Sequence, residues 1–126
     1  MSEQTQATPS GLLLSDDLIF TSRIAGTARA LGLEVRQVRA LDQLPDLAAR
    51  LGARCVLVDL AFPGLDLPDL MRRLGEAGAR PRVVAYGSHV DAESLRAARA
   101  AGCAPALPRS KFVEDLPAEL PGWLAG

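Results

Sequence analysis

The sequence predicts a doubly wound α/β domain, in which helices cover both faces of a five-stranded parallel sheet. Short apolar runs alternate along the chain with segments of helical periodicity, which is the pattern of successive β-α units. Three of these runs are apolar throughout, as strands of a parallel sheet covered on both faces must be. The length of 126 residues is that of one domain and argues against a multidomain enzyme.

Three strands and two helices are expected in the first half of the chain. The strands are 12–14, 34–38 and 55–58, of which the first and third are wholly apolar and the second alternates in polarity like an edge strand. The helices are 18–31 and 42–51, which have helical periodicity and are each followed by a glycine.

In the second half of the chain, predicted helices and strands again alternate. Helices at 66–76, 91–101 and 112–124 alternate with strands at 82–86 and 106–107. Possible N-caps for the helices are Asp42, Asp66 and Asp91. The glycines expected to end helices are Gly32, Gly52, Gly75 or Gly78, and Gly102. Two prolines, Pro117 and Pro121, weaken the last helix. Residues 1–10 are mostly polar and are expected to form a flexible leader, which leaves 11–126 as the domain.

Composition limits the function classes. With 48% hydrophobic residues and a mean hydropathy of +0.13, the chain can bury a core and is not disordered as a whole. Its 14 basic and 15 acidic residues form no basic run, so we expect no direct contact with nucleic acid or membranes. Cys55 and Cys103 lie among apolar residues, which is typical of reduced, buried thiols, and we expect a cytoplasmic protein.

Acidic residues follow two of the predicted strands. Asp16 and Asp17 come after the first strand, and Asp59 ends the third. In the flavodoxin-like strand order 2-1-3-4-5, these strands are neighbours, so their carboxylates would converge at one edge of the sheet. Such a cluster favours a bound cation, and Mg²⁺ is the natural choice. The alternative for Asp17 is a helix N-cap, whereas a loop follows Asp59 and capping does not easily explain it.

The segments LLLSDD at 12–17 and VLVDLAFPG at 56–64 resemble the receiver domains of bacterial two-component response regulators. The resemblance covers Gly11 to about Leu120 and implies a single receiver-like domain. It also implies that Asp59 accepts a phosphoryl group from a histidine kinase or a phosphotransfer protein. The magnesium ligands implied by the resemblance are Asp16, Asp17, Asp59 and the backbone carbonyl of Ala61.

The chain departs from the receiver pattern on the fourth and fifth strands. Tyr86 occupies the position of the usual Ser or Thr, and Ser88 is the nearest spare hydroxyl. The usual lysine position falls on Arg109, and Lys111 is the alternative phosphate contact. The ring of Tyr86 either closes the edge of the sheet or plugs the phosphoryl pocket.

The function that the resemblance implies is a stand-alone receiver-like signalling domain in a phosphorelay, rather than an enzyme. It would accept a phosphoryl group on Asp59 or, as a degenerate receiver (pseudo-receiver), dock a downstream protein. The face made by the fourth helix, fifth strand and fifth helix would serve for docking or for a homodimer. The alternatives are a phosphorylation-independent interaction module and, less favoured because the first loop is acidic, a flavodoxin-like binder of a small ligand.

Overall fold

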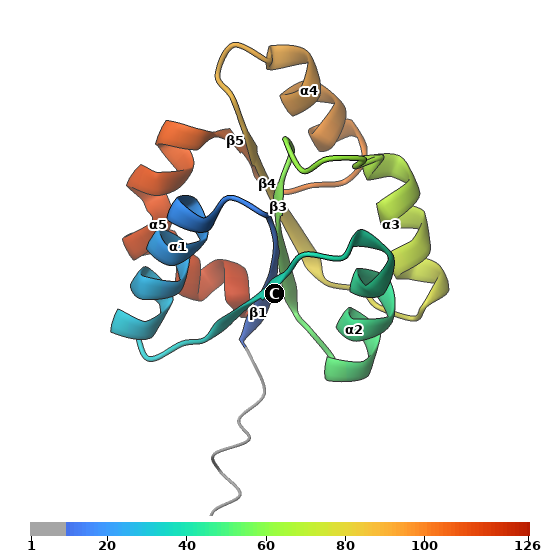
Figure 1. The fold of residues 1–126 in the computed structure, drawn as a ribbon, viewed down its shortest axis with the longest axis horizontal. Helices are drawn as coiled ribbons and strands as arrows, with labels where there is room; N and C mark the ends of the chain where they lie inside the picture. The colour runs from blue at the N-terminus through green and yellow to red at the C-terminus, as the bar shows by residue number, and fades with distance from the viewer. Residues whose placement is uncertain (1–9) are drawn as a thin grey trace, which may run out of the picture.

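Five parallel strands form one sheet in the order β2-β1-β3-β4-β5 in the computed structural model, which describes residues 10–126 (Figure 1). The strands are β1 (Gly11–Leu14), β2 (Val35–Val38), β3 (Cys55–Asp59), β4 (Arg82–Gly87) and β5 (Ala106–Pro108). The helices are α1 (Leu18–Ala30), α2 (Leu44–Leu51), α3 (Leu67–Glu76), α4 (Ala92–Ala100) and α5 (Arg109–Leu124). The predicted fold and strand order are therefore confirmed. The predicted leader lies outside the described residues except for Ser10.

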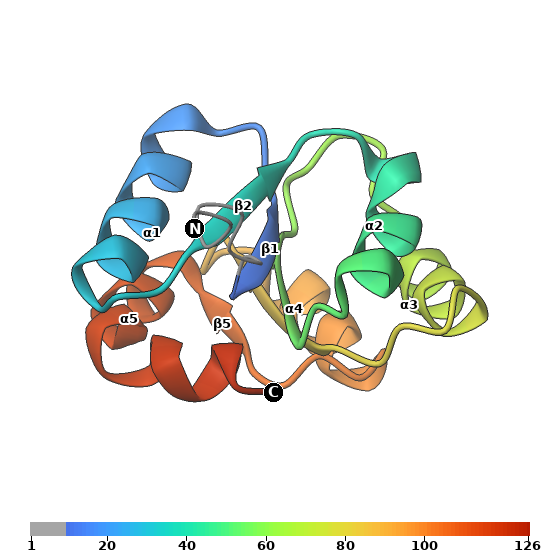
Figure 2. The same cartoon turned by 90° about the horizontal axis from the view of Figure 1, so that it is seen from below.

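The helices form a layer on each face of the sheet. Figure 2 shows α1 and α5 on one face and α2, α3 and α4 on the other. Strands β1 and β3 are buried along their whole length, whereas β2 lies at the edge and is only partly buried. This difference matches the apolar and alternating patterns of the sequence. None of the helices within 10–126 is long and apolar enough to cross a membrane.

Two of the three predicted aspartate caps are confirmed. Asp66 and Asp91 each accept a hydrogen bond from a backbone N–H three residues ahead, at 3.1 Å. The prediction for Asp42 was wrong, because this residue lies inside a short 3₁₀ turn, Leu41–Gln43, that precedes α2. Proline at position 45 sets the start of α2 instead, since its missing N–H costs nothing in the first turn of a helix.

Helix α5 begins at Arg109, three residues before the predicted start, and continues through Pro117 and Pro121. Each proline inside a helix removes a backbone hydrogen bond. The helix persists because it buries a row of large side chains against the sheet, namely Phe112, Leu116, Leu120, Trp123 and Leu124.

Four of the five aromatic residues gather between α1, α5 and the sheet. The ring of Tyr86 lies 4.8 Å from that of Phe20 and 4.5 Å from that of Phe112, and Phe112 stacks on Trp123 at 5.5 Å. Trp123 is buried in this aromatic cluster, so it covers the core and is not an exposed anchor for a partner.

Candidate functional site

Asp59 ends β3 at the carboxyl edge of the sheet and is only 3% exposed. Parallel pairing sets Leu14 of β1 beside Val58, so the next residue, Ser15, stands beside Asp59. The Ser15 hydroxyl donates a hydrogen bond to Asp59 Oδ2 at 3.2 Å, and the Ala61 N–H donates one to Oδ1 at 2.9 Å. Both oxygens of this buried carboxylate are therefore hydrogen-bonded, as burial of a charge requires.

Sequence reasoning missed Ser15. The residue follows β1 directly, and the register of a parallel sheet makes that position the neighbour of the residue that ends β3. The prediction used the acidic pair Asp16 and Asp17 instead, although the position directly after β1 indicates which residue lies beside Asp59.

Arg109, the first residue of α5, provides the positive charge nearest to Asp59. Its Nη2 lies 3.6 Å from Asp59 Oδ1, and its guanidinium lies over the rings of Phe20 and Tyr86 at 5.5 and 6.0 Å. Arginine suits this position because its planar head stacks on aromatic faces while its N–H groups stay available at the edge.

Lys111 lies two residues further along α5, and its Nζ pairs with Asp115 at 3.1 Å. Residues two apart on a helix differ by about 200° in direction, so Lys111 and Arg109 face different ways. Of the two predicted phosphate contacts, the structure brings only Arg109 to Asp59.

The three predicted carboxylates do not form one cluster. Asp16 and Asp17 are exposed, and Asp17 Oδ1 accepts a hydrogen bond from the N–H of Phe20 at 2.9 Å as the N-cap of α1. Across the described part of the chain, no group of three or more His, Cys, Asp or Glu side chains is arranged to hold a metal ion. The convergence expected of Asp16, Asp17 and Asp59 is thus corrected: Asp17 serves the helix, and Ser15 occupies the place beside Asp59.

Magnesium needs only one or two carboxylates, with carbonyl oxygens and water completing its shell. Asp59 and Asp16 would offer carboxylates, and Ala61 would offer a backbone carbonyl two residues after Asp59. The donor chemistry of these residues fits the ion, although Asp17 is engaged by α1.

Tyr86 is fully buried directly across from Asp59, with which it pairs in register between β3 and β4. Because β4 lies inside the sheet, the ring fills the core beneath the site and does not close an edge of the sheet. The hydroxyl is buried and has no hydrogen-bond partner in the described structure. Burial, and then the Asp59 carboxylate, raise the pKa of this phenol well above its ordinary value, so it stays neutral.

Ser88 is exposed in the loop after β4, where its Oγ accepts a hydrogen bond from the Val90 N–H at 3.3 Å. Together with His89, Arg109, Ser110 and Val113, it lines a pocket of about 580 Å³, which we call the β4-α5 pocket. Asp59 does not line this pocket.

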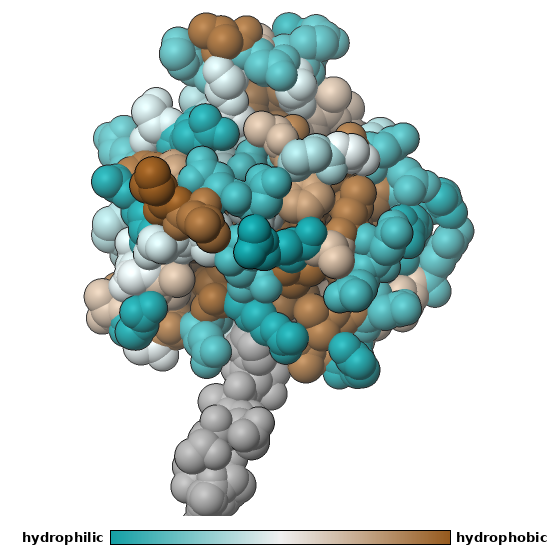
Figure 3. Space-filling view, viewed as in Figure 1, coloured by the Kyte–Doolittle hydropathy of each residue, from teal (hydrophilic) through white to brown (hydrophobic). Residues whose placement is uncertain are grey.

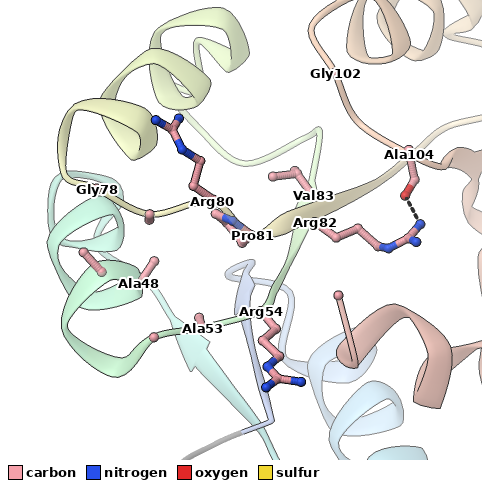
Figure 4. Close-up of a pocket in the computed structure, with 14 residues that line it drawn as sticks. Ala48, Ala53, Arg54, Gly78, Arg80, Pro81, Arg82, Val83, Gly102 and Ala104 are labelled. Carbon is pink, nitrogen blue, oxygen red and sulfur yellow. Dashed lines mark hydrogen bonds between the residues drawn. The ribbon is translucent and has the colours of Figure 1, made fainter.

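A second hollow of about 610 Å³ lies at the amino ends of the strands, among the starts of β3 and β4 and the loop before β5. Arg54, Arg80 and Arg82 line it, and Arg82 Nη1 donates a hydrogen bond to the carbonyl of Ala104 at 2.9 Å. Figure 4 shows that the three side chains point away from one another, so they do not converge on one ligand. None of the predicted site residues lies here.

Comparison with known proteins identifies the class of fold. No family model and no curated protein matches the sequence. The chain is similar to the receiver domain of the Francisella response regulator 1452, with a TM-score of 0.76, 15% identity, and coverage of 93% of this chain and 97% of that one.

Two further solved structures give the same result. The receiver domain of NtrX from Brucella abortus has a TM-score of 0.75 at 20% identity, covering 90% of this chain and 97% of that one. The signal receiver domain of a response regulator from Bermanella marisrubri has a TM-score of 0.74 at 18% identity, covering 92% and 98%. At these identities the likeness concerns the fold, and the chain has the fold of response-regulator receiver domains.

Proposed function

We propose that the chain is a receiver-type signalling domain of a phosphorelay and that Asp59 is its phosphoryl acceptor. The observation that carries this proposal is the placement of one buried carboxylate at the end of β3 with the guanidinium of Arg109 at 3.6 Å. Phosphoryl transfer needs positioning and charge neutralisation more than covalent help from the protein. A hydrogen-bonded carboxylate beside a fixed positive charge supplies both.

In this reaction an Asp59 oxygen attacks the phosphorus of a phosphohistidine on the donor protein. The new O–P bond forms as the P–N bond breaks, and the electron pair of that bond returns to the donor's imidazole. The hydrogen bonds from Ser15 and Ala61 fix the carboxylate, and Arg109 neutralises charge on the incoming phosphoryl oxygens. Magnesium held by Asp16, Asp59 and the Ala61 carbonyl would add further charge neutralisation.

The partners that follow from this proposal are a histidine kinase or phosphotransfer protein and a downstream protein. Figure 3 shows a hydrophobic patch over the start of α1, where Leu18 and Ile19 are exposed, the latter by 85%. Exposed apolar side chains beside a reactive site are typical of protein contact surfaces. We also propose that 11–126 acts as one domain in the cytoplasm and that α4, β5 and α5 form the second contact face, or a homodimer interface.

Amide NMR spectra with magnesium, and then with beryllofluoride as a phosphoryl mimic, test the proposal. We expect shifts around Asp59 that extend to Arg109 and α4. The Asp59→Ala variant should lose this response, whereas Lys111→Ala, on the same helix as Arg109, should keep it. If the wild-type spectrum shifts with magnesium but shows no further change when beryllofluoride is added, the acceptor role is contradicted.

A phosphorylation-independent interaction module is the second candidate, and Tyr86 favours it. The buried ring stands where receiver domains carry a short hydroxyl side chain, and its own hydroxyl makes no hydrogen bond within 10–126. On this hypothesis the docking surface is constant, and beryllofluoride leaves the spectrum unchanged.

A further inference from the structure

The guanidinium of Arg109 has donors that the described protein does not use. Its Nε is buried without a hydrogen-bond partner, and its only ion pair within 10–126 is the 3.6 Å contact with Asp59, which is longer than a hydrogen bond. A guanidinium carries five N–H donors, and a buried donor left unpaired costs free energy. The side chain as a whole is 39% exposed, so its solvent-facing part, and not the buried Nε, is open to an external acceptor.

Arg109 is also one of the residues that line the β4-α5 pocket. The other lining groups are the hydroxyls of Ser88 and Ser110, the imidazole of His89 and the apolar side chain of Val113. Hydroxyl, imidazole and guanidinium groups together form a donor set for an oxyanion. The volume of about 580 Å³ is within the range of small-molecule pockets and leaves room for an organic group beside the anion.

The charges around the pocket also favour an anion. No carboxylate lines it. Beside the pocket, Asp91 before α4 accepts hydrogen bonds from the Ser94 N–H and hydroxyl at 3.1 and 2.7 Å, and on α5 Asp115 pairs with Lys111 while Glu114 is exposed and does not line the pocket. Asp59 is the nearest acid to Arg109, and it is held from its other sides by Ser15 and Ala61.

We infer that the β4-α5 pocket binds a phosphate monoester reversibly, with Arg109 as its cationic anchor and Ser88, His89 and Ser110 as further contacts. This ligand is not the phosphoryl group on Asp59: no covalent bond forms, and the binding does not require an ionised Asp59. Because Arg109 serves both groups, ligand in the pocket competes with Asp59 for the same positive charge. The pocket therefore couples a small anion to the acceptor site.

Titration of the full chain with inorganic phosphate, followed by amide NMR at constant ionic strength with chloride as the balancing anion, tests this inference. We expect saturable shifts at Ser88, His89 and Ser110. Arg109→Met should weaken binding roughly tenfold or more, because it removes charge-assisted hydrogen bonds. Arg82→Met, an exposed arginine at the opposite edge of the sheet, is the matched control and should bind as the wild type does.

Two further variants keep the test decisive. His89→Asp changes only an exposed loop residue, so it should fold and should abolish phosphate binding by repulsion even if Arg109→Met fails to fold. Asp59→Asn should retain binding or strengthen it while losing the beryllofluoride response, which separates this inference from the proposed acceptor function. Phosphoserine, compared with phosphate, shows whether the organic group adds affinity.

Shifts that rise linearly without saturation, or equal affinity in the wild type and in His89→Asp, would overturn the inference. Loss of phosphate binding in Asp59→Asn would also overturn it, since the anion would then depend on the acceptor site. A failed beryllofluoride response with saturable phosphate binding would refute only the acceptor function.

Discussion

Replacing Tyr86 by phenylalanine should stabilise the domain. The substitution keeps the ring, which lies 4.8 Å from Phe20 and 4.5 Å from Phe112, and removes a buried hydroxyl that has no hydrogen-bond partner within 10–126. A buried hydroxyl left unpaired costs about 1–3 kcal/mol, so the free energy of unfolding should rise by about 1 kcal/mol or more.

Urea unfolding followed by fluorescence measures this change directly. Trp123 is the only tryptophan and belongs to the same aromatic cluster, so its emission reports the loss of that packing. With a slope of about 1–3 kcal/mol per molar urea, a gain of about 1 kcal/mol moves the midpoint up by roughly 0.3–1 M. Tyr86→Leu is the control that removes the ring as well, and it should lower the midpoint because aromatic pairs contribute about 0.5–1.5 kcal/mol each.

A destabilised Tyr86→Phe variant would refute this reasoning. Such a result would mean that the hydroxyl makes a hydrogen bond in solution, and Ser15, which already donates to Asp59, would be the first residue to test as its partner. The double variant with Ser15→Ala would then show whether the two losses add.

Three other predictions concern the thiols and the site around Asp59. Burial raises the pKa of Cys55 to about 12 and of Cys103 to about 11 from an ordinary value of 9.0. Because the unfolded chain loses these protons first, the stability that the neutral thiols contribute is present below pH 9 and is lost as the pH rises above it. The urea midpoint should fall steadily between pH 9 and 11, and a flat profile would contradict burial of the thiols. Asp59→Asn should weaken magnesium binding in a calorimetric titration, and unchanged affinity would remove Asp59 from the metal site. Tyr86→Thr with Arg109→Lys should increase labelling by a small-molecule phosphoryl donor, and no gain would leave the obstruction by Tyr86 without support.

The fold was predictable because burial of a parallel sheet determines the polarity pattern of its strands in the sequence. Strands covered on both faces are apolar at every position, and the edge strand alternates, so 12–14, 55–58 and 34–38 could be assigned from the sequence. The start of α5 could not, because the segment from Arg109 to Lys111 has no helical pattern of its own and is helical through packing of the residues that follow.

The candidate site was predictable where it depends on strand ends and less so where it depends on side-chain direction. Asp59 follows from its place at the end of a strand and Arg109 from the resemblance to receiver domains, and the structure brings the two side chains together. Whether Asp17 caps a helix or faces a metal depends on its side-chain torsion angles, which the sequence does not encode separately. The choice between Arg109 and Lys111 depended on where α5 begins, because helical rotation then decides which of them faces the sheet.

The described ends of the chain lie together at the amino ends of the strands, whereas Asp59 lies at their carboxyl ends. Gly11 begins β1 in a place so tight that a Cβ there would lie 2.5 Å from Leu124 Cδ2, and a Cβ at Gly126 would lie 3.5 Å from the Arg54 side chain. A biotin or dye attached at Gly126, which lies against Arg54 at the start of β3, would therefore stand about a full strand length from the Asp59 carboxylate at the other end of that strand. Protein immobilised by such a handle on a biosensor chip would present Asp59, the patch on α1 and the β4-α5 pocket to the solution, ready for kinetic measurements with partner proteins.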